Sequence, residues 1–136
     1  MDSNRLNQFA SRYTAAWCSH QAASVASFFA EHGSLQINGG APAIGRAAFT
    51  DSVQSFLTAF PDLLVHMDRL VLSGAKTEYH WTLTGTSTGP GATGNFVRIS
   101  GFEQWRLGPD GLIVESLGHF DVTDYERQLN ADRQSP

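Results

Sequence analysis

A histidine and an aspartate lie two residues apart at the end of the last predicted strand. The run Asp110-Gly-Leu-Ile-Val-Glu-Ser-Leu-Gly-His119-Phe-Asp121 opens with a turn signal and continues as an apolar segment. Residues at positions i and i+2 of a strand share a face, so His119 and Asp121 are predicted to point the same way. Beside apolar residues, this pair can transfer protons at a small-molecule site, or it can be an ordinary polar strand end.

Each member of this pair has a chemical interpretation and a structural one. At the mouth of an apolar cavity, the Asp121 carboxyl would have a raised pKa and could act as a general base near neutral pH. Its alternative role is to cap the following helix or to pair with an arginine. His119 could hold Asp121 in place or donate a proton to a developing enolate. Its alternative is a half-buried histidine bonded to a backbone carbonyl.

Other polar residues give weaker signals. Glu103 interrupts the apolar alternation of the strand predicted over residues 96–107. It is either a pocket group with a perturbed pKa or, if a bulge changes its facing, a solvent-side partner of an arginine. We favour the second interpretation, for Glu115 as well. The five histidines lack a paired-ligand spacing, which predicts no metal site. The glycine-rich loops match no phosphate-binding or dinucleotide-binding signature, so no cofactor is expected.

Three helices are predicted in the first half from apolar residues at three- to four-residue spacing. The first spans about residues 4–18, and a short second helix is stopped by Gly33. A strand over residues 34–38 and a loop over residues 39–45 precede the third helix, which Pro61 ends. The apolar positions are Leu6, Phe9, Ala10, Tyr13 and Trp17, then Ala22, Val25, Phe28 and Phe29, and finally Phe49, Val53, Phe56, Leu57 and Phe60.

The second half is predicted to form strands, because its apolar period falls to two. The strands run over residues 63–72, 77–87 and 96–107, and a turn over residues 108–111 leads into the last strand, with a loop over residues 89–94. A capping box from Thr123 to Glu126 predicts a short C-terminal helix. This is an α+β arrangement. Its aromatic helix faces must cover one side of a curved sheet, where an apolar cavity would form.

Composition narrows the class of protein. The chain has 136 residues, 41% of them hydrophobic and 16% charged, which fits one globular domain over residues 1–136. Its net charge of −4 gives no footprint for nucleic acid and no basic membrane patch. No apolar run is long enough to span a bilayer, and the N-terminus lacks the build of a signal peptide. We therefore expect a cytoplasmic protein.

Five segments carry a family resemblance. They are Phe60-Pro61-Asp62, Trp81-Thr-Leu-Thr-Gly85-Thr86, Gly91-Ala-Thr-Gly94, Asp110-Gly-Leu-Ile-Val-Glu115 and the ending Asp121 to Gln128-Leu129. Together they resemble the SnoaL-like polyketide cyclase family of the nuclear transport factor 2-like superfamily. The resemblance implies a cone-shaped, cystatin-like fold, with three N-terminal helices packed on a curved, mainly antiparallel sheet. It covers nearly the whole chain, with weaker matches before Gly45.

The resemblance also implies roles for individual residues. Asp121 matches the position where SnoaL-like cyclases and limonene-type epoxide hydrolases carry an acid–base aspartate. Gln36 and Asn38 lie near the positions from which those hydrolases orient a water molecule. Two departures matter. The hydrolases have Arg-x-Asp where this chain reads Tyr79-His80-Trp81, so their full acid–base set is missing. Many SnoaL-like sequences have Gly-Thr-His where this chain has Gly85-Thr86-Ser87.

The function predicted from these observations is a cofactor-independent cyclase or isomerase with Asp121 as general base and His119 as its helper. The substrate would be a small apolar or aromatic molecule with a carbonyl group. Non-catalytic ligand binding or dimerisation by the same fold is the alternative. A homodimer is expected through the outer sheet face that holds His80, Thr82 and Thr84. The predicted substrate-binding residues are Trp17, Gln36, Asn38, Tyr79, Trp81 and Leu117.

Overall fold

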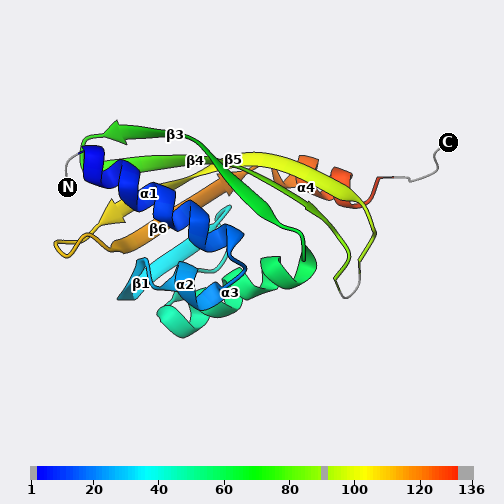
Figure 1. Cartoon of the computed structure of the whole chain (residues 1–136), viewed down its shortest axis with the longest axis horizontal. Helices are drawn as coiled ribbons and strands as arrows, with labels where there is room; N and C mark the ends of the chain where they lie inside the picture. Colours follow the sequence, from blue (N-terminus) through cyan, green and yellow to red (C-terminus); the bar gives the residue numbers. More distant parts are fainter. Residues whose placement is uncertain (1–2, 90–91, 132–136) are drawn as a thin grey trace.

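Six strands form one curved, open sheet in the computed structural model, which describes residues 3–89 and 92–131 (Figure 1). The order across the sheet is β2-β1-β6-β5-β4-β3. The strands are β1 (Phe29–Ile37), β2 (Ala43–Ile44), β3 (Leu64–Ser73), β4 (Lys76–Thr86), β5 (Phe96–Leu107) and β6 (Ile113–Phe120). The helices are α1 (Ser3–Cys18), α2 (Ala22–Ala26), α3 (Arg46–Ala59) and α4 (Val122–Leu129).

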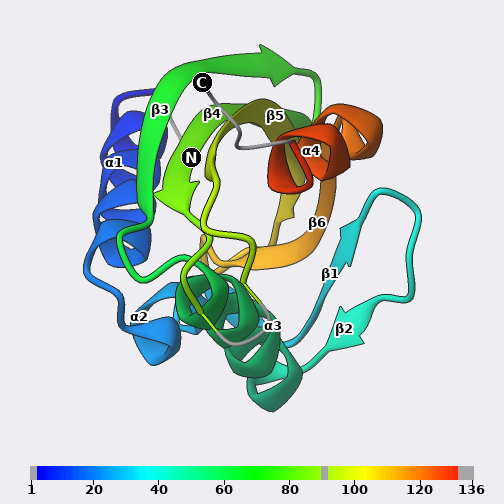
Figure 2. The same ribbon diagram turned by 90° about the vertical axis from the view of Figure 1, so that its right-hand side faces the viewer.

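The sheet is mixed but mainly antiparallel, as predicted. Only the β1–β6 pair runs parallel within the described strands, while the β1–β2, β3–β4, β4–β5 and β5–β6 pairs are antiparallel. The view in Figure 2 shows the strong curvature of the strands, with α1 beside β3 and α3 below the sheet. This is the predicted α+β arrangement. The predicted loop over residues 89–94 contains positions 90 and 91, which lie outside the described residues.

Helix periodicity explains how the helices cover the sheet. On α1, Leu6, Phe9, Ala10 and Tyr13 are buried at a spacing of three to four residues. The same spacing buries a second set of side chains on α3, namely Phe49, Val53 and Leu57. These two apolar stripes join the pocket-side residues of the sheet in one core.

Several predicted boundaries are wrong, since the strand predicted over residues 34–38 begins at Phe29 and the loop predicted over residues 39–45 contains β2. Gly33 does not stop a helix but lies inside β1, where a Cβ would come within 2.9 Å of the Ile113 carbonyl oxygen. The close approach of the two strands therefore requires glycine. The C-terminal helix begins at Val122 instead of after Thr123, and the Asp121 side chain caps it by accepting a hydrogen bond from the Asp124 N–H at 3.0 Å.

Two of the segments that carry the family resemblance, Phe60-Pro61-Asp62 and Trp81 to Thr86, join the end of α3 to the end of β4. A Cβ on Gly85 would lie 2.9 Å from Cβ of Phe60, so Phe60 packs where a side chain at residue 85 would stand. The carboxylate of Asp62 accepts the Thr86 N–H at 2.7 Å and the Thr86 hydroxyl at 2.8 Å. The matched residues therefore hold one helix end against one strand end.

Candidate functional site

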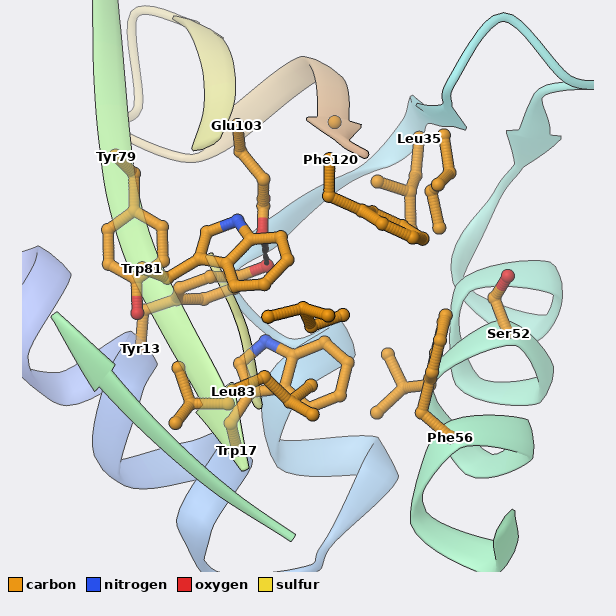
Figure 3. Close-up of a pocket in the computed structure, with 15 residues that line it drawn as sticks. Tyr13, Trp17, Leu35, Ser52, Phe56, Tyr79, Trp81, Leu83, Glu103 and Phe120 are labelled. Carbon is orange, nitrogen blue, oxygen red and sulfur yellow. Dashed lines mark hydrogen bonds between the residues drawn. The ribbon is translucent and has the colours of Figure 1, made fainter. Parts of the chain in front are cut away.

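An apolar pocket lies between the helices and the concave face of the sheet (Figure 3). Its volume is about 70 Å³. One water needs roughly 10–15 Å³ of such space, so the pocket can hold a small molecule or several waters. The lining residues are Tyr13 and Trp17 of α1, Leu35 and Ile37 of β1, Ser52, Val53 and Phe56 of α3, Val65 of β3, Tyr79, Trp81 and Leu83 of β4, Ile99 and Glu103 of β5, and Gly118 and Phe120 of β6.

Glu103 is the only acidic or basic lining residue in the described chain. It is 9% exposed, in the middle of β5. Its Oε1 accepts three hydrogen bonds: from the Tyr13 hydroxyl at 3.0 Å, the Trp105 indole N–H at 2.9 Å and the Ser116 hydroxyl at 2.9 Å. The other oxygen, Oε2, shares only the Tyr13 hydroxyl, at 3.1 Å. One carboxylate oxygen is therefore held by the protein and the other retains free acceptor capacity.

Burial raises the pKa of the Glu103 carboxyl, and the hydrogen bonds from Trp105, Ser116 and Tyr13 oppose this rise. These three donors are neutral groups, and the described pocket lining contains no lysine, arginine or histidine. No positive charge there stabilises the ionised carboxylate. A carboxyl with a raised pKa inside a pocket can accept and return a proton closer to neutral pH than an exposed carboxyl can.

The two tyrosines beside Glu103 remain protonated near neutral pH. Burial, and then the charge of Glu103, raise the pKa of Tyr13 well above its ordinary value, against a hydrogen bond from Trp17. Burial also raises the pKa of Tyr79. The Tyr79 hydroxyl lies 2.5 Å from the Thr14 hydroxyl, whose own proton is donated to the Ala10 carbonyl oxygen at 2.9 Å. Tyr79 is therefore the donor in its contact with Thr14.

Two glycines lie near Glu103. Gly118 pairs directly with Glu103 across β5 and β6, and a Cβ on Gly118 would meet nothing closer than 3.6 Å. On the other side, Gly101 pairs with Trp81, and a Cβ on Gly101 would lie 2.8 Å from Cζ2 of the Trp81 indole. The indole therefore crosses the position that a side chain of residue 101 would occupy. Gly118 therefore leaves space open beside Glu103, whereas the space at Gly101 is filled by its neighbours, the Trp81 indole among them.

The structure brings three of the residues predicted to bind substrate into this pocket: Trp17, Tyr79 and Trp81. They come from two elements, α1 and β4, and Figure 3 shows their side chains among those that line the pocket together with Glu103. Tyr79 also stacks on Trp105, with ring centroids 4.9 Å apart. Trp17 and Trp81 are half-buried, so each ring packs in the wall and keeps part of its surface open.

The prediction that His119 and Leu117 face the pocket is wrong. Among the described residues of β6, Gly118 and Phe120 line the pocket and Ser116 bonds to Glu103. Because side chains alternate along a strand, Leu117 and His119 point to the outer face. His119 is exposed there, its ring centroid 4.9 Å from that of Phe102. Gln36 pairs with Leu117, also lies outside the lining, and donates to the Gly40 carbonyl oxygen.

The expected pocket positions of Asp121 and Asn38 are wrong as well. β6 ends at Phe120, so the strand alternation that aligned Asp121 with His119 no longer applies at residue 121. The Asp121 side chain is exposed and caps α4. The exposed Asn38 uses its Oδ1 to accept the Phe120 N–H at 2.9 Å, which extends the contact between β1 and β6. Both side chains accept hydrogen bonds from backbone N–H groups near the end of β6.

The preferred solvent-side interpretation of Glu103 is also corrected. Its strand contains no bulge at that point, since β4 and β5 pair in continuous register from Lys76 to Thr86. The alternation that places Val97, Ile99 and Trp105 inside therefore places Glu103 inside with them. This alternation of apolar residues is visible in the sequence and could have identified Glu103 as a pocket residue. Glu115, in contrast, lies outside the pocket lining, 3.8 Å from Arg106, as expected of a solvent-side partner.

The profile of one protein family, SnoaL-like polyketide cyclase, matches residues 7–129. The chain belongs to this SnoaL-like family. No curated protein matches it. Within the described residues of this SnoaL-like protein, no helix is long and apolar enough to cross a membrane. The same residues include no group of three or more histidine, cysteine or acidic side chains placed to hold a metal ion.

Solved structures share the fold at low sequence identity. TsrD from Streptomyces laurentii is 20% identical with a TM-score of 0.82, over 97% of this chain and 99% of that one. A Catenulispora acidiphila protein with a ketosteroid isomerase-like fold, solved with trimethylamine, is 15% identical with a TM-score of 0.79, over 94% and 97%. SalBIII, an epoxide hydrolase/cyclase-like enzyme of pyran ring formation in salinomycin, is 19% identical with a TM-score of 0.77, over 90% and 95%.

Proposed function

We propose that this SnoaL-like protein is a cofactor-independent cyclase or isomerase in which Glu103 is the general base. Glu103 takes the role that the sequence assigned to Asp121. The observation that carries the proposal is the asymmetry of its carboxylate. Oε1 is held by three donors, while Oε2 retains lone pairs within an apolar pocket. Such a group can remove a proton from a carbon next to a carbonyl and return it elsewhere.

The substrate class follows from the pocket walls. They are mostly aromatic and aliphatic, with Trp17, Tyr79 and Trp81 as binding surfaces for a small apolar or aromatic molecule. The volume of about 70 Å³ favours a small ligand in this conformation. Pockets for larger ligands usually enclose roughly 300–1,000 Å³. A polyketide-sized substrate would therefore require half-buried rings such as Trp17 and Trp81 to move outward.

The same small volume favours a second candidate function. The fold could serve as a non-catalytic domain that binds a small ligand or only associates with a second copy. A thermal-shift screen separates ligand binding from a filled, purely structural cavity, because a ligand that binds only the folded state raises its stability by mass action.

Exchange of ketone α-protons tests the catalytic proposal without a known substrate. In D2O, the wild type should accelerate the loss of the α-proton NMR signal of acetone or cyclohexanone. Glu103→Gln should reduce the enzymatic rate by about 10²- to 10⁴-fold, because it removes the base and preserves the side-chain volume. Asp121→Asn should keep the wild-type rate, since Asp121 is exposed outside the pocket. Loss of exchange in Asp121→Asn with retention in Glu103→Gln would restore the sequence-based assignment.

We also propose that the protein forms a homodimer through the outer sheet face. The rings of His80, Phe102 and His119 stack in a row across β4, β5 and β6, with successive centroids 5.2 and 4.9 Å apart. Next to this row, the buried Thr82 hydroxyl is bonded to Asp68 and Ser100. A continuous row of rings flanked by polar groups is suited to pairing with its own copy around a twofold axis.

A further inference from the structure

The hydrogen-bond donors next to Glu103 are already in use. The hydroxyl protons of Tyr13 and Ser116 and the indole N–H of Trp105 go to the Glu103 carboxylate. The Tyr79 hydroxyl donates to Thr14. Trp17 hydrogen-bonds to Tyr13. None of these groups can donate to a bound carbonyl oxygen without giving up a bond that it makes now.

One indole N–H in the pocket remains uncommitted. Within the described part of the chain, Trp81 Nε1 donates to no protein acceptor, although Trp81 lines the pocket. Among the described residues, no side-chain nitrogen or oxygen is both buried and unpaired, so the unpaired Nε1 of Trp81 is accessible. The hydroxyl of Ser52 also lines the pocket, but it comes from α3, across the cavity from Glu103 in Figure 3. Trp81 is therefore the free donor on the Glu103 side.

Sheet register places the Trp81 indole beside the base. Trp81 pairs with Gly101, two residues before Glu103 on the same face of β5. The indole lies over Gly101, because a Cβ there would be 2.8 Å from Cζ2 of Trp81. The Phe120 ring, 6.1 Å away by centroid, packs on it edge to face. Figure 3 shows the indole of Trp81 and the carboxylate of Glu103 both reaching into the pocket.

We propose that the Trp81 indole N–H binds the carbonyl oxygen of the substrate while Glu103 Oε2 removes a proton from the adjacent carbon. The C–H bond breaks and its proton moves to Oε2. The electron pair forms the C=C bond of an enolate, and the carbonyl π electrons move to the oxygen that Trp81 holds. Glu103 then returns the proton to another carbon, which completes an isomerisation with no co-reactant. The inference rests on the proposed function of Glu103.

Such a donor stabilises charge that develops in the transition state more than it stabilises the bound ketone. Trp81→Phe removes the N–H and preserves an aromatic ring in the wall. We therefore expect the cyclohexanone exchange rate at saturation to fall about 10²-fold, with an apparent KM within threefold of the wild type. Phe102→Leu, on the outer face of the strand that carries Glu103, is the matched control and should keep the wild-type rate.

A spectroscopic measurement on the wild type tests the same contact without a mutation. The three tryptophans give three indole N–H resonances in a ¹⁵N-labelled sample. Those of Trp17 and Trp105 are already committed, to Tyr13 and Glu103. Adding cyclohexanone should move the Trp81 resonance downfield in proportion to occupancy and move the other two much less. A Trp81 resonance that stays in place at saturation would overturn the inference.

The outcomes separate this inference from the function on which it rests. If the wild type exchanges no ketone protons, Glu103 is not the proposed base and both proposals fail. Exchange that disappears in Glu103→Gln but persists at the wild-type rate in Trp81→Phe contradicts only the role of Trp81. A loss in Trp81→Phe that appears entirely as a raised KM also contradicts it, because the indole would then be a packing surface.

Discussion

Glu103 lies within the sheet and Asp121 follows its strand β6, and the two carboxylates have opposite surroundings. Glu103 stands in the middle of β5 on the concave face, where burial raises its pKa and three side chains hold one of its oxygens. Asp121 follows the last residue of β6 and is exposed. Its side chain accepts a hydrogen bond from the first turn of α4. A polar residue within an apolar alternation is a better indicator of a pocket group than one at the end of a strand.

The largest effect on the free energy of unfolding should come from removing an aromatic side chain that packs on the inner face of β5. Trp105, 0% exposed, anchors Glu103 from the inner face, whereas the half-buried Phe102 lies on the outer face. Trp105→Ala should lower the free energy of unfolding by about 3–5 kcal/mol. Phe102→Ala should lower it by about 1 kcal/mol if the outer face is open to solvent. Urea denaturation of both variants measures the difference.

The same pair of variants also tests the homodimer. If a second copy covers the outer face, Phe102→Ala should cost more than an open surface would predict, and its stability should depend on protein concentration. Sedimentation of the wild type should then give twice the mass of one chain. A concentration-independent loss of about 1 kcal/mol, together with a monomeric mass, would contradict the proposed pairing.

The Glu103 carboxyl should make stability fall as pH rises. Its pKa is raised in the folded state, so between the unfolded value of roughly 4.3 and the folded value the native state binds more protons. Stability from this group is complete below the unfolded value and is lost as pH rises through the folded value. Tyr13 and Tyr79, the titratable groups that face Glu103, have raised pKa values and stay neutral over this range.

Glu103→Gln should remove that slope, which reaches at most about 1.4 kcal/mol per pH unit. The measurement is the free energy of unfolding of the wild type minus that of Glu103→Gln, followed upward from pH 4. A difference that increases with pH would mean that the ionised carboxylate is better stabilised in the fold than in water. The distinction drawn between the two carboxylates would then fail.

The smallest effect belongs to the exposed carboxylate. Asp121 accepts the Asp124 N–H as the N-cap of α4. Asp121→Ala should therefore lower the free energy of unfolding by about 1 kcal/mol. Asp121→Asn should change it little, because asparagine caps helices as well as aspartate does. Thermal denaturation of the two variants checks this, and equal losses in both would show that the charge matters more than the cap.

The sequence predicted the fold well because the fold follows from local periodicity. Apolar spacing predicted α1 to within a residue of its start, and an apolar alternation interrupted at Glu103 predicted β5 over its observed span of Phe96–Leu107. The resemblance around Phe60 and Gly85 was carried by packing, which any chain with this joint between α3 and β4 must satisfy. Gly33 misled because a glycine that allows close strand approach looks the same in sequence as one that ends a helix.

The site was harder to predict because it depends on which way a strand faces. In β6 the apolar Leu117 was predicted to face the pocket. The inner positions are instead the small residues Ser116 and Gly118, which lie beside Glu103. Pairing with β5 decides which face of β6 points into the pocket. The spacing of residues within β6 alone does not determine that pairing. Trp17, Tyr79 and Trp81 were placed in the pocket because large rings on apolar faces need no knowledge of that pairing.

The contacts between Phe60 and Gly85 and between Asp62 and Thr86 have a consequence for the family as a whole. They fix the joint between α3 and β4, and none of these four residues lines the pocket. These residues can therefore preserve the fold while the pocket lining changes, for example by substitution of a lining residue such as Gly118. Relatives recognised by this joint will share a shape and can differ in the reaction performed inside it.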